Sequence, residues 1–252
     1  MKLEQLQFIE TTHSTNVTLR ENASLTLQDW DKDSHFYGIY TLEQTQGKGL
    51  GSNRWLSQRG QNILISFLFQ PPITIQNQFY FNQYFAIAIR NFLSNYIENP
   101  LIKWPNDIYV GNTKIAGILI EHSIQGDLLK YSVAGVGINI NQTLFDPEIP
   151  NPTSLRLLTG KEYKITDLIL ELVKSLNETY HLILNQEFSE LEQEYLNHLF
   201  QYQTTARYLI QEQEIIGTIV GLSPIGQLLI QSETGVLHTC NYKEVKFLLS
   251  EL

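Results

Sequence analysis

The segment Asn62-Ile63-Leu64-Ile65-Ser66-Phe67-Leu68-Phe69 decides the fold of this chain. It has the length of a strand, and both faces of such a strand would be apolar. A strand of this kind has to be covered on both sides. We therefore expect residues 62–69 to lie inside a sheet that has other elements packed on each face.

Three stretches can supply the helices that cover this sheet. Residues 14–28 begin with Ser14 and Thr15, either of which can cap a helix. Residues 166–200 are expected to be helical in two pieces. Residues 76–96 place apolar side chains at steps of three and four, which predicts a helix with one buried face. That face comprises Phe81, Phe85, Ala88, Ile89 and Phe92.

Further strands are predicted between these helices. Residues 36–45 and 131–140 have strand character, and two turn signals indicate hairpins. One turn is Gly111-Asn112 within residues 109–114, and the other is Gln125-Gly126-Asp127 within residues 121–129. These elements predict a mixed α+β fold with a largely antiparallel sheet backed by helices.

The pattern of the sequence changes at about Thr204. Short strands alternate with turns around Gly217, Gly221, Gly226 and Gly235, which predicts a small β-barrel-like module. So short a segment buries little surface alone and should dock on the larger part. We expect one domain over residues 1–203 and a second over residues 204–252.

Composition and charge limit the classes of function. The chain has 252 residues, 42% hydrophobic and 17% charged, which is ordinary for a globular protein. Its formal net charge of −9 makes it a poor general binder of nucleic acid, because the phosphates would be repelled. An anionic ligand would need a local positive site that overrides this field.

The expected location is the cytoplasm. Cys240 is the only cysteine, so no intrachain disulfide can form, which fits a reducing compartment. The first residues lack the apolar stretch of a signal peptide. Nowhere do about 18 apolar residues follow one another, so no membrane span is expected.

A glycine-rich basic loop is the most informative stretch for chemistry. Residues 44–55 read QTQGKGLGSNRW, and between Gln44 and Asn62 there are cations but no acid. Glycine lets backbone N–H groups approach an anion closely, and Lys48 adds a full charge. The spacing fits neither a Walker loop nor a Rossmann fingerprint. From this stretch alone, a solvated surface loop is as good an interpretation as a loop that binds an anion.

Two further lysines lie near predicted strand ends. Lys103 opens Lys103-Trp104-Pro105-Asn106-Asp107, in which proline and Asn-Asp provide turn chemistry. Lys114 begins Lys114-Ile115-Ala116-Gly117-Ile118-Leu119-Ile120-Glu121. Regular alternation predicts that Lys114 shares a face with Ala116 and Ile118, and not with Gly117. The alternatives without a ligand are that residues 103–107 form a tight connection between strands, and that Lys114 extends from a strand end to solvent.

Two other segments can contact a ligand. Gly135-Val136-Gly137-Ile138-Asn139 closes a strand, and glycine in a strand often marks the close approach of a ligand or backbone. Asn139 could then reach a phosphate, although a turn asparagine is the simpler interpretation. Ser14-Thr15-Asn16 is first a helix start and second a set of polar ligand contacts.

Together and in this order, these segments resemble the biotin protein ligase family. The resemblance covers nearly the whole chain, and the glycines after residue 204 resemble the family's small SH3-like domain. It implies an ATP-dependent enzyme that makes biotinyl-5'-AMP with Mg²⁺ present. The enzyme then transfers biotin to a lysine of a biotin carboxyl carrier protein, as a monomer or homodimer without nucleic acid or membrane partners.

The resemblance also assigns roles to residues. Lys114 and Lys48 would be catalytic, with Lys114 bridging the biotin carboxylate and the α-phosphate. Asp107 would lie near a magnesium ion held through the phosphates. Biotin would contact Ser14, Thr15, Asn16, Gln44, Gly47, Lys48, Gly49, Leu50, Trp55, Lys114 and Gly117. ATP would contact Lys48, Arg54, Lys103, Asn106, Lys114 and Asn139.

The sequence departs from the common family pattern in three places. Leu50 and Asn53 stand where the loop is often basic. Residues 151–155 offer no tryptophan before Thr153-Ser154-Leu155, so no residue is assigned to stack on adenine. The catalytic part is entered by about residue 13 without a helix-turn-helix, which resembles the ligase-only class and not the biotin repressor.

Two other functions compete with this interpretation. A lipoate or octanoate ligase shares the catalytic fold, but residues 103–107 and the C-terminal module favour biotin. A non-catalytic adenylate-binding protein is the second alternative, and the joint presence of Lys48, Lys114 and the glycines opposes it.

Overall fold

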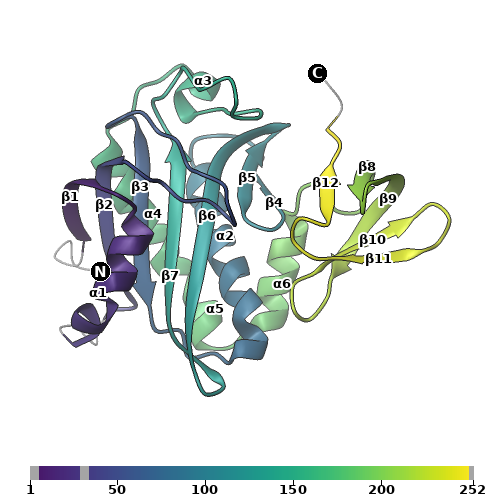
Figure 1. The fold of residues 1–252 in the computed structure, drawn as a ribbon, viewed down its shortest axis with the longest axis horizontal. Coiled ribbons are helices and arrows are strands. Elements are labelled where there is room, and N and C mark those ends of the chain that lie inside the picture. The colour runs from purple at the N-terminus through teal and green to yellow at the C-terminus, as the bar shows by residue number, and fades with distance from the viewer. Residues whose placement is uncertain (1–5, 29–33, 250–252) are drawn as a thin grey trace.

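A computed structural model describes residues 6–28 and 34–249 of the chain (Figure 1). The larger part is built on a seven-stranded sheet in the order β1-β2-β3-β7-β6-β5-β4. Its strands are β1 Leu6–Thr12, β2 Phe36–Gln44, β3 Asn62–Phe69, β4 Leu101–Lys103, β5 Asp107–Val110, β6 Thr113–Gln125 and β7 Leu128–Asn139. Only β1 and β2 pair in parallel among these strands, so the prediction of a largely antiparallel sheet is confirmed.

Helices cover both faces of this sheet (Figure 1). One face carries α1 Thr15–Gln28, which lies over β2, β3 and β7. The other carries α2 Gln78–Ser94, preceded by a short 3-10 turn at Ile75–Asn77, and α4 Ile165–Thr179. The remaining helices are α3 Leu155–Thr159, α5 His181–Leu184 and α6 Phe188–Asn197.

The strand that decides the fold is buried along its whole length. Every residue of β3 is buried, and the strand lies between β2 and β7. Its apolar residues divide between two cores: Phe67 packs in the large core on the α2 side, and Leu68 packs in a small core under α1. The expectation of cover on both faces is therefore confirmed. All five apolar residues predicted for the buried face of α2 have no exposed surface.

Two elements differ from the sequence predictions. The strand β1 was not predicted, because four of its seven residues are exposed and the others are only half-buried. It is a parallel edge strand that pairs with β2 from Leu6 to Thr12. Residues 166–200 contain three helices and not two. Gln186, with a left-handed φ of 55°, separates α5 from α6, and a further interruption at Tyr180 separates α4 from α5.

The C-terminal residues form a separate five-stranded antiparallel sheet in the order β11-β10-β9-β8-β12. This sheet is compatible with the SH3-like module that the resemblance implies. The indole Nε1 of Trp104 donates to the carbonyl of Gly226 at 2.9 Å, and Phe79 packs against the same glycine. These contacts dock the small sheet on the larger part. The strands are β8 Thr205–Ile210, β9 Gln213–Leu222, β10 Leu228–Ser232, β11 Leu237–Cys240 and β12 Val245–Phe247.

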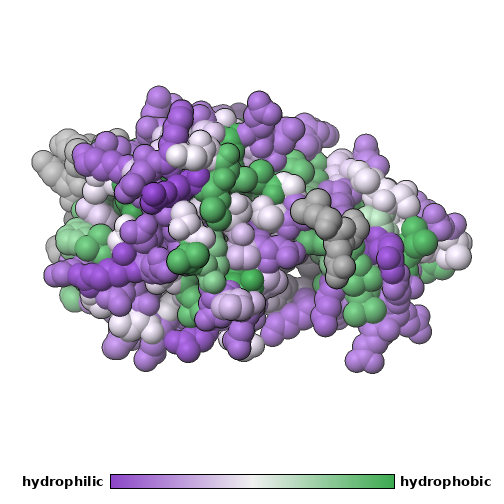
Figure 2. Space-filling model, turned by 90° about the horizontal axis from the view of Figure 1, so that it is seen from above, coloured by the Kyte–Doolittle hydropathy of each residue, from purple (hydrophilic) through white to green (hydrophobic). Residues whose placement is uncertain are grey.

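The surface seen from above is mostly hydrophilic, with hydrophobic residues in small separate groups and a notch where the two parts meet (Figure 2). Within the described residues, no helix has both the length and the apolar character needed to cross a bilayer.

A half-buried histidine gives the fold a pH-dependent stability. His122 lies on β6, and its Nδ1 is 2.8 Å from the hydroxyl of Ser132 on β7. Burial lowers the pKa of His122 from 6.5 to about 4. The folded protein thus binds this proton more weakly than the unfolded chain. The stability that depends on neutral His122 is present above pH 6.5 and is lost as the pH falls toward about 4.

We predict that His122→Gln removes most of this pH dependence. One pKa unit corresponds to about 1.4 kcal/mol, so the loss of unfolding free energy through His122 is about 2 kcal/mol when the pH falls to about 5. Urea unfolding at about pH 7.5 and about pH 5 measures the difference. The exposed His181→Gln is the control and should behave like the wild type. An unchanged pH dependence in His122→Gln would assign it to other groups.

Candidate active site

A single cavity of about 970 Å³ collects most of the residues singled out in the sequence. The N-terminus of α1, the loop 47–55, the turn between β4 and β5, strands β6 and β7, and the C-terminal segment 242–249 surround it. The predicted site residues that line it are Ser14, Thr15, Asn16, Gln44, Lys48, Gly49, Leu50, Arg54, Trp55, Lys103, Asn106, Asp107, Lys114 and Gly117.

Gly47 and Asn139 do not line the cavity. Gly47 lies against the carbonyl of Trp55, so it shapes the loop from behind. Asn139 is buried, and its amide donates to the carbonyl of Thr153 at 2.9 Å. The side chain of Asn139 therefore holds the 151–154 connection, and its predicted contact with ATP has no support from this geometry.

The charge of the cavity is opposite to that of the whole chain. Among the described residues that line it, Asp107 is the one acid. Six cationic side chains line the same cavity: Lys48, Arg54, Lys103, Lys114, Lys243 and Lys246. In a chain of net charge −9 this is the local positive site that an anionic ligand requires.

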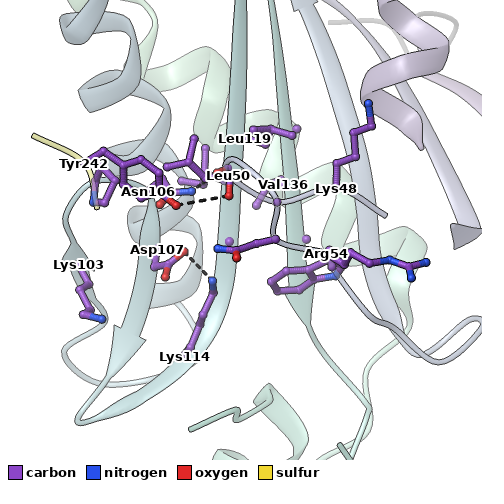
Figure 3. A pocket seen from close by; sticks show the side chains of 18 of the residues that line it. Lys48, Leu50, Arg54, Lys103, Asn106, Asp107, Lys114, Leu119, Val136 and Tyr242 are labelled. Atoms are coloured by element: carbon purple, nitrogen blue, oxygen red, sulfur yellow. Dashed lines mark hydrogen bonds and ion pairs between the residues drawn. The ribbon is translucent and has the colours of Figure 1, made fainter. Parts of the chain in front are cut away.

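The glycine-rich loop forms a small hairpin and not an open surface loop. The Trp55 N–H donates to the Gly47 carbonyl at 3.0 Å, and the Gly49 N–H donates to the Asn53 carbonyl at 2.8 Å. Between these bonds Lys48 and Arg54 form an antiparallel bridge. Both side chains are exposed. They lie on the opposite side of the cavity from Lys103, Asp107 and Lys114 and extend away from those residues (Figure 3).

Trp55 closes the base of this hairpin against two glycines of the sheet. Gly117 on β6 and Gly137 on β7 face one another in register. A Cβ atom on either would lie within 3 Å of the Trp55 ring, so only glycine leaves room for the indole. Within the described residues the buried indole Nε1 has no hydrogen-bond partner, so the ring is held by its packing on the two glycines and by the Lys114 ammonium near its face.

A β-bulge aims Lys114 into the cavity. Ile108 pairs with Ala116 and Tyr109 with Lys114, which leaves Ile115 as an extra residue on β6. A bulge of this kind reverses the alternation of side chains. The Lys114 side chain therefore lies beside Gly117, 3.3 Å from where a Cβ would stand, and not on the face of Ala116 and Ile118. The prediction from regular alternation was wrong for this reason.

Both the backbone and the side chain of Lys114 are fixed. Its N–H donates to the Asn151 carbonyl at 2.7 Å, and its carbonyl accepts from the Thr153 N–H at 2.9 Å. Its Nζ forms an ion pair of 2.7 Å with the Asp107 carboxylate (Figure 3) and lies 5.7 Å from the centre of the Trp55 ring. The ammonium is thus held in the cavity without a ligand.

Lys103 joins the two parts of the molecule at the same cavity. Its Nζ lies 4.6 Å from the ring centre of Tyr109 and 5.0 Å from that of Phe247 on β12. Burial lowers the pKa of the Lys103 ammonium, and the Asp107 carboxylate opposes this shift. Cation–π contacts of this kind keep a partly desolvated ammonium in place.

The turn that precedes β5 positions Asp107. The Trp104–Pro105 peptide is cis. The Asn106 side-chain amide donates to the Ile118 carbonyl at 2.5 Å, and the main-chain carbonyl of Asn106 accepts from the Ile118 N–H at 2.8 Å. Asn106 therefore fastens the turn to β6.

The donor set around Asp107 is compatible with magnesium held through phosphates. Across the described ranges, no three His, Cys, Asp or Glu side chains gather into a metal site. Magnesium in phosphate sites commonly takes only one or two carboxylates, with substrate phosphates and water as the other ligands. Asp107 provides one such carboxylate beside the lysines.

The other end of the cavity is polar but uncharged. Gln44, at the end of β2, accepts from the Thr15 N–H at 2.8 Å and so caps the first turn of α1. Ser14, Thr15 and Asn16 are all buried beside it. The cavity thus joins a neutral hydrogen-bonding end to a cationic end, which suits a ligand with a polar ring and an acid group.

Residues 8–139 match the protein family model described as the biotin/lipoate A/B protein ligase family. The match covers more than half of the chain. The chain belongs to the biotin/lipoate A/B protein ligase family.

Individual family members are similar over different lengths. The bifunctional ligase/repressor BirA of Bacillus spizizenii is 27% identical over 199 residues, which are 77% of this chain and 61% of that protein. The biotin–[acetyl-CoA-carboxylase] ligase of Paracoccus denitrificans is 35% identical over 63 residues, which are 23% of this chain and 26% of that protein. The chain therefore spans about three fifths of the length of the BirA protein it matches.

A solved family structure shares the whole architecture. The biotin protein ligase from Aquifex aeolicus, in complex with biotin and ATP, has a TM-score of 0.75 and 26% sequence identity. The similarity covers 96% of this chain and 97% of that chain, including the C-terminal sheet.

Sequence reasoning missed two groups of cavity residues in this family member. Ser66 on β3 is fully buried and lines the cavity; its signal was a lone hydroxyl within an otherwise apolar strand. The second group is the segment 242–249, which reaches the cavity only through tertiary packing. Its Tyr242 hydroxyl donates to the Leu50 carbonyl at 3.4 Å, so the C-terminal part contacts the tip of the hairpin.

Proposed function

We propose that this chain is an ATP-dependent biotin protein ligase. It would activate biotin as biotinyl-5'-AMP and transfer the biotinyl group to a lysine of a biotin carboxyl carrier protein. The observation that carries the proposal is the single cavity that joins a neutral polar end, at Thr15 and Gln44, to a cationic end at Lys114 and Lys103. The names of the family relatives and the bound ligands of the Aquifex aeolicus enzyme support it.

The first step joins two anions, and the cations of the cavity serve that step. A carboxylate oxygen of biotin attacks the α-phosphorus of ATP, the bond to the bridging oxygen breaks, and pyrophosphate leaves with the electron pair. Lys114 would lie between the carboxylate and the α-phosphate and offset the charge that gathers there. Lys103 would add charge from the C-terminal side, and Lys48 and Arg54 would act when the hairpin closes.

In the second step the amine of the acceptor lysine attacks the acyl carbon of the adenylate. The carbon–oxygen bond to AMP breaks, and an amide forms as the amine loses a proton. Until then the mixed anhydride must be kept from water. The hairpin, with Leu50 at its tip and Trp55 at its base, would cover the adenylate in this period.

Magnesium would be held by Asp107 together with the phosphates, and when bound it screens their charge. For the other residues we propose the roles that the family resemblance implies. Ser14, Thr15, Asn16, Gln44, Gly49 and Gly117 would contact biotin, and Asn106 would lie near the phosphates through its place in the cavity-lining turn.

The polar end of the cavity favours biotin over lipoate. Biotin carries a cyclic urea with N–H donors and a carbonyl acceptor, whereas the dithiolane ring of lipoate has neither. Thr15 and Gln44 would leave buried polar groups unpaired against a dithiolane, which costs roughly 1–3 kcal/mol for each group. The unpaired groups of Thr15 and Gln44 would therefore disfavour lipoate relative to biotin.

We predict that the purified protein exchanges labelled pyrophosphate into ATP when biotin and magnesium are present. Lipoate and octanoate, at the same concentration, should support less than about a tenth of that exchange, since one unpaired buried group already costs about tenfold. Exchange with lipoate but not with biotin would establish the alternative ligase. Tight binding of biotin without exchange would identify a non-catalytic binding protein.

The proposal extends to the location, the partners and the oligomeric state of the protein. We propose a cytoplasmic enzyme without nucleic acid as a partner, acting as a monomer or homodimer. The carrier protein would be part of a carboxylase, as the name of the Paracoccus denitrificans relative suggests. The division into residues 1–203 and 204–252 is proposed as the domain boundary.

A further inference from the structure

The turn at residues 241–244, between β11 and β12, meets the tip of the hairpin at residues 47–55. We propose that Tyr242 and Lys243 in this turn are positioning residues, which hold the hairpin tip at the mouth of the cavity and so slow the escape of the adenylate. The inference rests on the proposed function, because the adenylate is the intermediate of that reaction. It concerns how long the intermediate stays in the cavity and not how it forms.

The hairpin tip touches the turn at two neighbouring residues. The Tyr242 hydroxyl donates to the Leu50 carbonyl at 3.4 Å (Figure 3). The Lys243 side chain lies over Gly51, where a Cβ atom would be 2.8 Å from Nζ and 3.1 Å from Cε. Glycine at residue 51, with its left-handed φ of 69°, lets this side chain approach. Contacts at adjacent residues therefore hold the tip from the C-terminal side.

The turn is itself fastened to the C-terminal sheet. The Asn241 N–H donates to the Glu244 carboxylate at 2.7 Å, and the Glu244 N–H donates to the Asn241 carbonyl at 3.0 Å. The side-chain amide of Gln227, next to β10, donates to the Asn241 side-chain carbonyl at 2.8 Å. Lys243 has a left-handed φ of 74°, which a lysine keeps only where its surroundings over-determine it. The turn is thus a firm support for the hairpin tip.

Tyr242 suits a lasting contact with a main-chain carbonyl. The residue is half-buried, and burial together with the charge of Asp107 raises the pKa of the Tyr242 hydroxyl from its ordinary value. The hydroxyl therefore keeps its proton and remains a donor at neutral pH. Because Leu50 accepts through its main chain, its side chain stays free to line the cavity. One residue thus anchors the tip and covers the ligand.

Loss of these contacts should affect release of the adenylate more than its formation. Lys114 and Lys103, the cations proposed to act on the reacting groups, are held by Asp107 and by aromatic rings and not by the hairpin tip. The hairpin, in contrast, has to move before the adenylate can leave or water can enter. The 241–244 turn opposes that movement.

The first test measures opening of the hairpin without any reaction. Lys48 and Arg54 are exposed trypsin sites within the hairpin, and cleavage there requires the hairpin to leave its bonded form. Limited proteolysis of the full chain, followed by mass spectrometry, should be about two- to fivefold faster at these sites in Tyr242→Phe. Lys243→Gly should raise cleavage at Arg54 by about threefold. It should not lower the unfolding temperature, because glycine adopts the left-handed φ freely.

The second test follows the dissociation of pre-formed biotinyl adenylate. Tyr242→Phe should release it faster by a similar factor, about two- to fivefold, while the single-turnover rate of adenylate formation changes less. Tyr208→Phe is the matched control. It removes another hydroxyl of the C-terminal sheet, on β8 outside the cavity, which has no hydrogen-bond partner within the described residues. This variant should match the wild type in both tests.

The outcomes separate the inference from the proposed function. Wild-type cleavage in Tyr242→Phe would show that the contact does not hold the hairpin and would overturn the inference. An equal effect in Tyr208→Phe, or faster cleavage with unchanged release of the adenylate, would overturn it as well. If the wild type formed no adenylate, the proposed function would fall and the link to retention with it, whereas the cleavage test would still report on the contact.

Discussion

Lys114→Ala is expected to slow formation of the adenylate by roughly 10²–10³ while changing the affinity for biotin much less. The ammonium is already held at the cavity by Asp107 at 2.7 Å and by the backbone bonds to residues 151 and 153. A preorganised charge of this kind acts mainly where charge develops during the reaction. Alanine removes that charge and also leaves the Asp107 carboxylate without its partner.

The measurement is the single-turnover rate of adenylate formation, together with the dissociation constant of biotin. Lys130→Ala is the matched control, since Lys130 is an exposed lysine on β7 outside the cavity. It should leave both quantities near their wild-type values. If Lys114→Ala weakened biotin binding by the same factor as it slowed adenylation, Lys114 would be a binding residue only.

Gly137→Ala is expected to have the second largest effect. A Cβ at this position would lie within 3 Å of three atoms of the Trp55 ring, so the indole has to move. Movement of Trp55 displaces the base of the hairpin that carries Lys48 and Leu50. Because a misplacement of about 1 Å can cost about a hundredfold in rate, we expect adenylation to slow by roughly ten- to a hundredfold.

A double-mutant cycle with Trp55→Ala separates this effect from general damage. In the Trp55→Ala background the indole is absent, so Gly137→Ala should change the rate by less than about threefold. Thermal unfolding of each variant checks that the fold persists, since overpacking usually costs about 1–3 kcal/mol. Additive effects on the rate would contradict the proposed contact between the two residues.

The local pattern of the sequence predicts most of the larger sheet. The apolar run of β3 and the spacing of Phe81, Phe85 and Phe92 on α2 are set by burial, which has a clear period in sequence. The edge strand β1 lacks that signal because it is only half covered and pairs in parallel. Its partner is fixed by the tertiary fold and not by its own residues.

In the site, too, some features follow from the local sequence and others only from the tertiary fold. Residue types and order indicate Lys48, Lys103 and Lys114 as cations for an anionic ligand. The face on which Lys114 lies depends on a one-residue bulge at Ile115, which no local pattern announces. Ser66 was overlooked because its apolar neighbours dominate the strand signal. The approach of Tyr242 to Leu50 joins residues 192 positions apart, so it follows only from docking of the C-terminal sheet.

We propose that one cavity activates biotin and passes it to a protein lysine. The most direct test incubates the chain with biotin, MgATP and a biotin carboxyl carrier domain, and follows AMP and the carrier mass together. We predict one AMP for each carrier molecule modified, with the added mass of a biotinyl group on a single lysine. A carrier that stays unmodified, or AMP that never forms while biotin is present, would contradict the account.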